Sequence, residues 1–531
     1  MAAPPSRAAS SQAPLQQHMD GLVQLLGEGT LRVIQLNRPK ALNAMNEEMV
    51  VEFGKALEVI AASPNTATVV FRGVGRGLCA GGDVMAIVDA MNKPTVEERN
   101  KSTSFFQQEL QQDYRVANFE KTTSQSGRPK YYIAMLDGIS MGGGIGLSAH
   151  APFRVVSERT MFAMPEVAIG YFPDVGLTHT FARLDGNTGM YLALTGERLN
   201  GADTYLLGIG THYIRSNLLE ELTHRLGTLP LESVNSGEVV DKVLNEYASD
   251  PFAPDAENGA ELAKNSVFFG DRRIAIDFAF GLESVEQIVA ALDDIANVRQ
   301  DSYTLKQLAQ RGLTTISPEV QAFAKTTAET LRMRSPRALK VTFRAVQRAA
   351  KMTLTECFHE NMRLGTVFCD MTVGRDFYTG VKHTLEKDPA TGKRRTGRAN
   401  WQPATLEEVD EKQLETLFFG DLDAAHKAGL TLQVPKLGIP ALQNTREYRK
   451  ARDAELRGVG PLHWDQKYNR FALPSEAEIA ALVEGSHPAA GSYVLEPQEI
   501  IEVMSRHKHD KPALKLKLHD WLQRRAAAEK K

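Results

Sequence analysis

Two carboxylates and two glycine clusters are the residues whose types and spacing could perform chemistry. Glu166 and Asp174 lie eight residues apart, and both follow the glycine run at 142–144. A second glycine-rich segment, GVGRGLCAGGD, occupies residues 73–83. Glycine permits unusual backbone angles and close approach, so each cluster can expose backbone N–H groups. One amide from each loop could form an oxyanion hole, beside which a carboxylate could act as acid, base or nucleophile.

Each glycine cluster by itself is also compatible with an ordinary turn at the end of a buried strand. Apolar runs at 68–72 and 131–136 precede the two clusters, which indicates two strands that each lead to a glycine turn. The second turn continues into a small-residue segment at 145–149, where a helix is expected to start. Because both turns and both acids occur in one ordered series, we interpret them as parts of a single site.

The elements that must position these loops follow a recurring pattern of strands and helices. Alternating apolar residues predict a hairpin, and Asn46 can cap the helix that follows it. The predicted strands are 21–26, 31–37, 66–73, 131–136 and 152–156, and the first predicted helices are 47–61 and 96–118. The region 187–420 shows mainly helical periodicity, for example at 284–296 and 318–331. The expected fold class is therefore α/β.

Length and composition exclude several classes of protein. The 531 residues exceed one ordinary domain, and a hydrophobic share of 42% suffices for a large core. The 62 basic and 65 acidic residues nearly balance, so the overall charge indicates neither nucleic acid nor an acidic membrane as a partner. No apolar run is long enough to span a bilayer, and no histidine and cysteine cluster has metal-ligand spacing. We expect no membrane segment and no metal.

The three cysteines, Cys79, Cys357 and Cys369, are too few for a disulfide framework and fit a reducing compartment. Cys79 lies within the first glycine cluster, but no histidine or other base is near it in the sequence. We therefore expect a small buried apolar side chain at this position rather than a nucleophile.

Five segments in series resemble the crotonase superfamily, also called the enoyl-CoA hydratase/isomerase superfamily, and within it the family of 3-hydroxyisobutyryl-CoA hydrolases. They are LNRPKALNAMN (36–46), CAGGD (79–83), GISMGGGIGLS (138–148), MPEVAIGYFPDVG (164–176) and YLALTGERLNGAD (191–203). The resemblance implies a crotonase-type spiral of ββα turns with a helical C-terminal part, over a domain at 20–423. Residues 1–19 are expected to be a transit peptide or a disordered tail, and residues 424–531 a C-terminal extension with a basic end.

The resemblance also assigns roles to the glycine loops and the acids. The amides of Gly82 and Gly143 are expected to hold the thioester oxygen. Glu166 matches the catalytic glutamate of the family, and it would either attack the thioester carbonyl or activate water. Asp174 matches the second acid of the hydrolases, which would hold the 3-hydroxyl group of the substrate or assist proton transfer.

Substrate-binding positions follow from the same resemblance. Arg38, Lys40, Ala41 and Leu42 match the segment that contacts the adenine and phosphate end of CoA, where cations suit the phosphates. Asp113, in the pair Asp113-Tyr114, is expected to match an acid that lines the acyl pocket.

Two positions bear on the type of reaction. Enoyl-CoA hydratases carry a second catalytic glutamate where this chain has Gly146, so the resemblance favours thioester hydrolysis over hydration. The hydrolases typically read FPDVGGG, whereas Leu177 and Thr178 replace the last two glycines here. This departure could narrow the acyl pocket or reshape the turn beside Asp174.

The sequence thus predicts a mitochondrial hydrolase that converts 3-hydroxyisobutyryl-CoA to 3-hydroxyisobutyrate and CoA in valine catabolism. No cofactor is expected, because CoA is part of the substrate. The oligomeric state and the acceptance of 3-hydroxypropionyl-CoA stay open. The alternative is a structural component of the small subunit of mitochondrial ribosomes, with or without activity, since some members of the family are built into it. The extension at 424–531 would then contact the subunit or its rRNA.

Overall fold

The computed structural model describes residues 16–125, 127–387, 391–440, 446–458, 464–491 and 495–529. The first fifteen residues of the predicted leader at 1–19 lie outside the described residues. Its last four residues, Gln16–Met19, form strand β1, which pairs with the next strand in antiparallel orientation. Backbone hydrogen bonds to that strand make these four residues part of the sheet, directly before the predicted start of the domain at residue 20.

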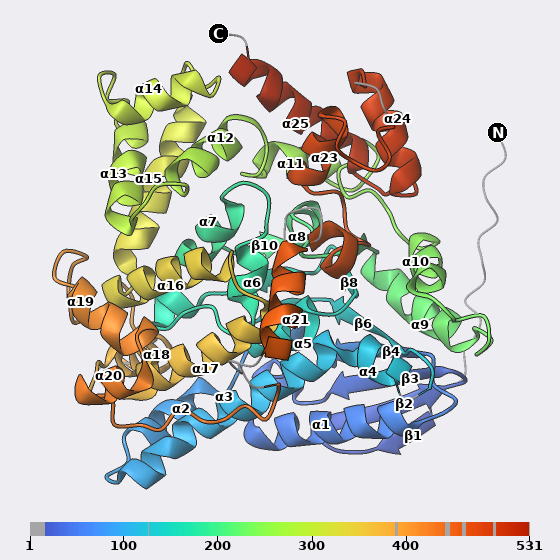
Figure 1. The fold of residues 1–531 in the computed structure, drawn as a ribbon, viewed down its shortest axis with the longest axis horizontal. Coiled ribbons are helices and arrows are strands. Elements are labelled where there is room, and N and C mark those ends of the chain that lie inside the picture. The colour runs from blue at the N-terminus through green and yellow to red at the C-terminus, as the bar shows by residue number, and fades with distance from the viewer. Residues whose placement is uncertain are drawn as a thin grey trace.

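Helices form most of the chain (Figure 1). None of the helices in the described ranges is both long and apolar enough to cross a membrane. The helices of the first half are α1 (Glu47–Ala62), α2 (Val84–Met91), α3 (Val96–Ala117), α4 (Phe119–Gln125), α5 (Gly143–Ala149), α6 (Leu177–Phe181), α7 (Thr188–Thr195), α8 (Gly201–Leu206), α9 (Leu219–Gly227), α10 (Gly237–Asn245) and α11 (Gly259–Asn265). Those of the second half are α12 (Gly270–Ala279), α13 (Val285–Ala296), α14 (Tyr303–Gln310), α15 (Pro318–Met333), α16 (Pro336–Ala349), α17 (Leu354–Cys369), α18 (Asp376–Leu385), α19 (Glu411–Leu414), α20 (Leu422–Lys427), α21 (Arg446–Arg457), α23 (Glu476–Val483), α24 (Pro497–His507) and α25 (Leu514–Glu529). Shorter helical turns are η1 (Pro39–Ala41), η2 (Glu166–Ile169), η3 (Ser216–Leu218), η4 (Glu415–Phe419) and η5 (Trp464–Tyr468).

The larger sheet has the strand order β1-β2-β3-β4-β6-β8-β11. The pairs β1–β2 and β2–β3 are antiparallel, and the pairs from β3 onward are parallel. The strands are β2 (Val23–Glu28), β3 (Leu31–Leu36), β4 (Thr68–Gly73), β6 (Tyr131–Leu136), β8 (Phe153–Val156) and β11 (His212–Tyr213). The predicted hairpin and the three strands after it are confirmed.

Helices cover both faces of this sheet. Neighbouring side chains along a strand point to opposite faces, so each central strand packs against helices on both sides. Phe71 of β4 packs against Phe53 of α1, with ring centroids 5.4 Å apart. The adjacent Val70 belongs to a second buried cluster, which it shares with Leu222 of α9. Figure 1 shows α1 on one side of the sheet and α9 and α10 on the other. The central strands are therefore apolar on both faces, which explains their continuous hydrophobic runs.

The smaller sheet has the strand order β10-β9-β7-β5. Its strands are β5 (Gly77–Cys79), β7 (Ile139–Met141), β9 (Met161–Ala163) and β10 (Leu199–Asn200). The first three run parallel, and β10 is antiparallel to β9. Parallel neighbours end at the same edge of a sheet. The segments that follow β5, β7 and β9 are therefore brought together at one edge.

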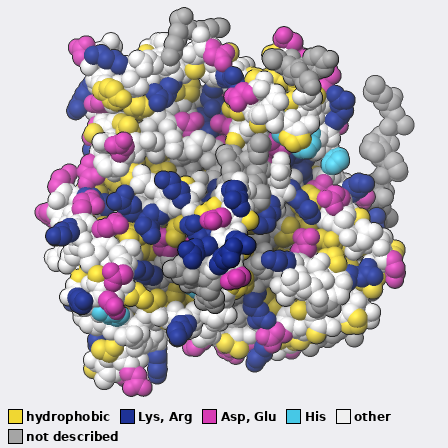
Figure 2. Space-filling view, in the orientation of Figure 1, with side chains coloured by type: hydrophobic (Ala, Val, Ile, Leu, Met, Phe, Trp, Pro, Cys, Tyr) yellow, Lys and Arg dark blue, Asp and Glu magenta, His cyan; other side chains and the backbone are white. Residues whose placement is uncertain are grey.

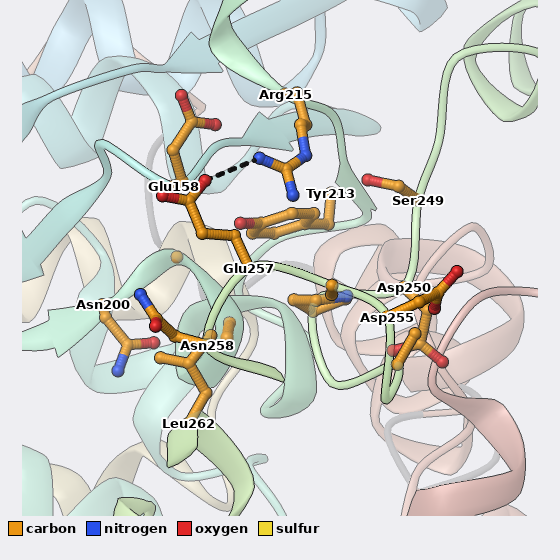
Figure 3. A pocket seen from close by; sticks show the side chains of 15 residues that line it. Glu158, Asn200, Tyr213, Arg215, Ser249, Asp250, Asp255, Glu257, Asn258 and Leu262 are labelled. Carbon is orange, nitrogen blue, oxygen red and sulfur yellow. Dashed lines mark hydrogen bonds and ion pairs between the residues drawn. The ribbon is translucent and has the colours of Figure 1, made fainter. Parts of the chain in front are cut away.

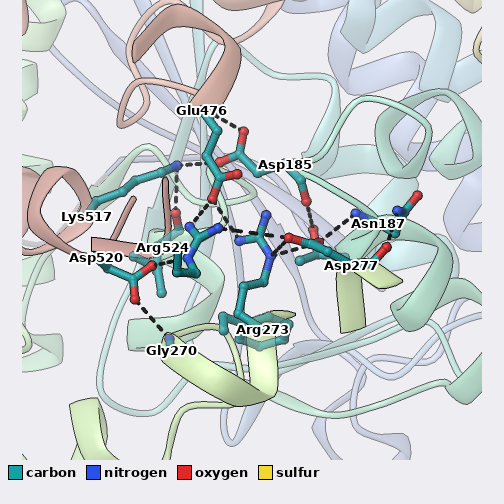
Figure 4. Close-up of polar contacts among 12 residues, drawn as sticks. Asp185, Asn187, Gly270, Arg273, Asp277, Glu476, Lys517, Asp520 and Arg524 are labelled. Atoms are coloured by element: carbon teal, nitrogen blue, oxygen red, sulfur yellow. Dashed lines mark hydrogen bonds and ion pairs between the residues drawn. The ribbon is translucent and has the colours of Figure 1, made fainter. Parts of the chain in front are cut away.

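Buried ion pairs join the C-terminal helices to the rest of the molecule (Figure 4). Glu476, the first residue of α23, binds both Arg273 of α12 and Arg524 of α25. The ammonium group of Lys517, also on α25, lies 2.7 Å from a carboxylate oxygen of Asp185. The sequence predicted a C-terminal extension with a basic end over residues 424–531. Two cations of this basic end, Lys517 and Arg524, turn inward, because acidic partners on other elements lie beside them.

A segment before α21 crosses helix α3. The side-chain amide of Gln107 donates a hydrogen bond to the carbonyl of Lys436 at 2.5 Å, and that of Gln111 donates to the carbonyl of Leu437 at 2.6 Å. Because the two glutamines lie one turn apart, a single face of α3 is attached to this segment. The C-terminal part of the chain thus contacts the helix that carries Asp113.

Candidate active site

Three adjacent parallel strands deliver the predicted site residues. Gly82 follows β5, Gly143 follows β7 and Glu166 follows β9, each within three residues of the strand end. The three segments also touch, because a Cβ atom on Gly142 would lie 3.2 Å from the Cα of Gly81 and 3.3 Å from Oε1 of Glu166. Only glycine at position 142, where φ is 50°, allows this close approach without strain.

The amides of Gly82 and Gly143 donate no hydrogen bond within the described part of the chain. Gly143 is the first residue of α5, and the first amides of a helix have no acceptor inside it. Beside Gly82, the amide of Met45 donates to the carbonyl of Gly81 at 2.8 Å, and the amide of Asp83 donates to the carbonyl of Met45 at 2.8 Å. This bridge leaves the Gly82 amide unused, so two neighbouring loops each carry a free backbone donor.

Glu166 begins η2 and is buried. Its Oε2 atom has no hydrogen-bond partner among the described residues. Burial, and then the negative charge of Asp174, raise the pKa of the Glu166 carboxyl well above its ordinary value. A carboxyl group in this state accepts protons more readily than an exposed glutamate does, as a general base requires.

Asp174 lies between η2 and α6, and burial raises the pKa of its carboxyl to about 7. The hydroxyl of Tyr171 donates a hydrogen bond to this carboxyl, which opposes the rise of the pKa. The backbone turns sharply after the acid, since φ is 46° at Val175 and 78° at Gly176. The ring of His150 contacts the Val175 carbonyl at 2.8 Å through Nε2 and supports the turn.

Helix α3 adds two further carboxyls. Asp113 is fully buried, and neither of its oxygens has a hydrogen-bond partner among the described residues. A Cβ atom on Gly146 would lie 2.6 Å from Oδ1 of Asp113, so this acid fills the space beside that glycine. One turn earlier, the buried Glu109 occupies the space beside Gly143, where a Cβ atom would overlap its Oε1.

Glu109 is the site residue that the sequence reasoning missed. The available signal was its position on α3, four residues after Phe105 and four before Asp113, inside the apolar stripe of the helix. An acid within such a stripe is buried with the apolar residues around it. The matching of Asp113-Tyr114 to a family pair drew attention away from this position.

Four buried carboxyls therefore meet at this edge of the smaller sheet: Glu109, Asp113, Glu166 and Asp174. Burial is the main cause that raises the pKa of Glu109 and of Asp113 well above their ordinary values, and neighbouring acids add to it. No lysine or arginine of the described chain lowers the pKa of any of the four. Four carboxylates so placed cannot all be ionised, so the cluster contains both proton donors and proton acceptors. Such clusters are typical of catalytic sites.

The loop predicted to bind CoA lies beside the Gly82 loop. The carbonyl of Leu42 accepts a hydrogen bond of 3.0 Å from the first residue after β5. The guanidinium of Arg38 lies 3.2 Å from Oδ2 of Asp83, so its charge is already paired. Lys40 and Ala41 belong to η1, and Lys40 is exposed without an ion-pair partner in the described chain. Lys40 is thus the free cation of this loop.

The two residues that depart from the family pattern belong to the core. Leu177 and Thr178 begin α6, and both are buried. The side-chain amide of Asn361 on α17 lies 3.3 Å from the Thr178 hydroxyl, and its carbonyl oxygen accepts the Gly176 amide at 2.8 Å. The two residues therefore pack α6 against α17 immediately after the Asp174 turn.

The side chain of Cys79 packs behind the glycine run at 142–144. It is not placed to act as a nucleophile beside the acids. It is fully buried, and a Cβ atom on Gly144 would overlap its side chain. Burial raises the pKa of its thiol to about 12, so the reactive thiolate does not form at neutral pH. The prediction that Cys79 is a small apolar core residue is confirmed.

A cavity of about 540 Å³ lies apart from the four acids (Figure 3). Several of its charged groups are engaged within the protein. Arg215 pairs with Glu257 at 3.2 Å, and Asp250 accepts the amide of Phe252 at 2.8 Å. None of the predicted site residues lines it. We therefore place the candidate active site at the edge of the smaller sheet and not in this cavity.

Comparison with known proteins agrees with this fold. Residues 31–418 match the enoyl-CoA hydratase/isomerase family. The chain therefore belongs to the enoyl-CoA hydratase/isomerase family, as its five sequence segments predicted. The expected α/β fold, a crotonase-type core with a helical C-terminal part, is confirmed.

Particular relatives fall into two groups. The mitochondrial 3-hydroxyisobutyryl-CoA hydrolase of Xenopus laevis is 36% identical over 409 residues, which are 75% of this chain and 89% of that protein. The small ribosomal subunit protein mS47 of Neurospora crassa is 31% identical over 503 residues, which are 94% of this chain and 84% of that protein. Among solved structures, a carnitinyl-CoA dehydratase from Mycobacterium thermoresistibile superposes with a TM-score of 0.56 at 29% identity, over 80% of this chain and 100% of that one.

Proposed function

We propose that this protein hydrolyses the thioester of a short 3-hydroxyacyl-CoA, with 3-hydroxyisobutyryl-CoA as the substrate. The observation that carries the proposal is the pair of free amides, Gly82 and Gly143, beside buried carboxyls that lack partners. Amides suit the thioester oxygen, and the unpaired acids suit a polar acyl group such as a hydroxyl. The similarity to hydrolases over 75% of the chain supports the same substrate.

In the proposed mechanism, the two amides bind the thioester oxygen and stabilise the negative charge that forms on it. Glu166 removes a proton from water as the water oxygen attacks the carbonyl carbon. The carbon–sulfur bond then breaks, and the CoA sulfur leaves with the proton that Glu166 received. Direct attack by Glu166 would instead form an anhydride that water opens. Single turnover in oxygen-18 water detects an anhydride that water opens at the Glu166 carbon, because this opening leaves the label in Glu166, whereas direct attack of water on the thioester carbonyl places the label in the product acid.

The remaining acids position the acyl group. Asp174, oriented by Tyr171, accepts the 3-hydroxyl of the substrate, and Glu109 and Asp113 of α3 line the acyl end. At the mouth of the site, Lys40 is the free cation for the CoA phosphates, while Arg38 holds the loop through Asp83. No cofactor enters this scheme, because CoA arrives with the substrate.

The test is thiol release from 3-hydroxyisobutyryl-CoA by the purified full chain. We expect turnover by the native protein and a loss of at least about 100-fold in Glu166→Gln, since the base is removed while the shape is kept. Glu283→Gln, the same change at an exposed acid, should leave the rate unchanged. A folded native protein that releases no thiol, or a Glu166→Gln variant with full activity, would refute the proposal. Hydration of crotonyl-CoA, measured in parallel, should be absent.

A second function is favoured by a separate observation. The family match ends at residue 418, whereas the similarity to mS47 covers 94% of the chain and so includes most of the C-terminal extension. We propose that the chain is also a component of the mitochondrial small ribosomal subunit, in addition to its activity. The test is sedimentation of the protein with small subunits from mitochondrial extracts in high salt. A protein that stays at the top of the gradient, although present in mitochondria, would contradict this role.

A further inference from the structure

We propose that the outward face of helix α21 binds the phosphate backbone of RNA. Four cations define this surface, the α21 patch: Arg446, Arg449, Lys450 and Arg457. Their spacing places them on one face of the helix, and all four are exposed. In Figure 2, Lys and Arg side chains gather in the middle of the face where Figure 1 shows α21. The inference rests on the second proposed function and names the surface that would serve it.

The opposite face of α21 attaches the helix to the protein through polar groups. Tyr448 lies 3.4 Å from Oε1 of Glu356 on α17, and Arg452 pairs with the same carboxylate. The hydroxyl of Tyr468 donates to Glu455 at 3.0 Å. These contacts fix which face of the helix points outward, so the α21 patch is held in one orientation on a rigid support.

Helix α21 contributes no buried residue to the core. A short helix without an apolar face gains little stability from folding alone, so its sequence is not explained by packing. Ion pairs within the protein do not explain the charged residues on its outward face either. None of the four patch cations pairs with an acid among the described residues, although Asp453 lies one turn from both Arg449 and Arg457.

The other cations of the C-terminal extension show the contrast. Lys508, Lys511, Lys517 and Arg524 all pair with buried or half-buried acids. The helix itself carries two exposed acids, Glu447 and Asp453, against its four patch cations. Lys467 and Lys351 are also exposed. Lys467 lies 4.7 Å above the ring of Tyr468, and Lys351 precedes α17.

The chemistry of the patch suits phosphate groups. Three of its four side chains occupy two consecutive helical turns, and two of these are arginines, whose planar donors match phosphate oxygens. A row of cations along about 16 Å of helix, at ~1.5 Å per residue, can contact several phosphates of one strand. Ribosomal subunits are rich in RNA, so this surface has a suitable partner there.

The experiment measures binding of the full chain to a short fluorescein-labelled RNA duplex by fluorescence anisotropy, at several salt concentrations. The test variant is Arg446→Glu with Arg449→Glu and Lys450→Glu. We expect affinity to fall at least tenfold and the slope of log affinity against log salt to decrease by about 2, since each lost phosphate contact contributes roughly 0.7–0.9. Hydrolysis of 3-hydroxyisobutyryl-CoA should be unchanged.

The matched control reverses three exposed lysines on other helices, Lys55→Glu with Lys264→Glu and Lys306→Glu, so the change in net charge is the same. Equal losses in both triple variants, or native protein that does not bind the duplex, would overturn the inference. The two proposals fail separately. Salt-resistant sedimentation with small subunits by the α21 variant would leave the ribosomal function standing and exclude the patch. Patch-dependent RNA binding without sedimentation would leave the patch standing and exclude the ribosomal function.

Discussion

Burial raises the pKa of Asp174 to about 7, against two hydrogen bonds that lower it, one from its own backbone amide and one from Tyr171. Burial disfavours its charge, whereas the hydroxyl of Tyr171 stabilises the charge by donating a hydrogen bond. The tyrosine ring is itself fixed in an aromatic cluster, stacked on Phe106 with centroids 5.4 Å apart and packed against Phe377 at 4.7 Å. The ring packing thus sets the position of a hydroxyl that tunes the acid.

This arrangement predicts the pH dependence of the reaction. If the ionised form of Asp174 accepts the substrate hydroxyl, kcat/KM rises with pH and levels off above about 7. In Tyr171→Phe the ring packing is kept but the donated hydrogen bond is lost, so the pKa of Asp174 rises and the inflection moves to higher pH. The pH profiles of the two proteins provide the measurement. An unchanged inflection in the variant would show that a different group titrates.

Among the elements, α23 and α25 illustrate how a helix is joined to a distant part of the chain. Glu476 is shared by Arg273 and Arg524, and the exposed fractions of the three side chains are 15%, 3% and 13%. Removing one charge of such a buried group leaves the others uncompensated, which costs more than the pair itself contributes.

We therefore expect Glu476→Gln to lower the free energy of unfolding by about 3–5 kcal/mol. Glu529→Gln is the matched control, because Glu529 pairs with Arg525 at the surface of α25 at 2.8 Å, where a loss of at most about 1 kcal/mol is expected. Urea denaturation followed by circular dichroism measures both variants. Similar losses in the two would mean that the buried network contributes no more than a surface pair.

The helices and strands also show which parts of the structure could be predicted from the sequence. The strands could be predicted from local patterns, because alternation lies within a few residues. The roles proposed for Glu166 and Asp174 came from the resemblance of short motifs to a known family. The inward direction of Lys517 and Arg524 could not be predicted, since their acidic partners are far away in the chain. The placement of β1 was missed because an Ala-, Ser- and Pro-rich composition obscured its pairing with β2.

At the scale of the whole molecule, the C-terminal extension is part of the main hydrophobic core. Apolar residues of α23, α24 and α25 share one buried cluster with the α/β part, among them Ile479, Leu482, Met504 and Leu518. The family match ends at residue 418, but the packing does not end there.

We therefore expect that a chain truncated after residue 423 does not reach the native state. Deletion would expose core residues and leave Arg273 without its partner Glu476, at a cost above the typical total stability of about 5–15 kcal/mol. Soluble yield and thermal melting of the truncated and full chains provide the measurement. A soluble truncated protein that melts cooperatively near the temperature of the full chain would show that the α/β part folds alone.

The smaller sheet also determines how large a reacting group the protein can accept. Gly82, Gly143 and Glu166 leave three neighbouring strands, and neighbouring strands are spaced ~4.8 Å apart. The width across the reacting centre is therefore a fixed property of the backbone, close to that of one carbonyl group and its substituents. Changes in acyl preference should then arise on α3, the helix that approaches from outside the sheet, where side chains can vary without disturbing a strand.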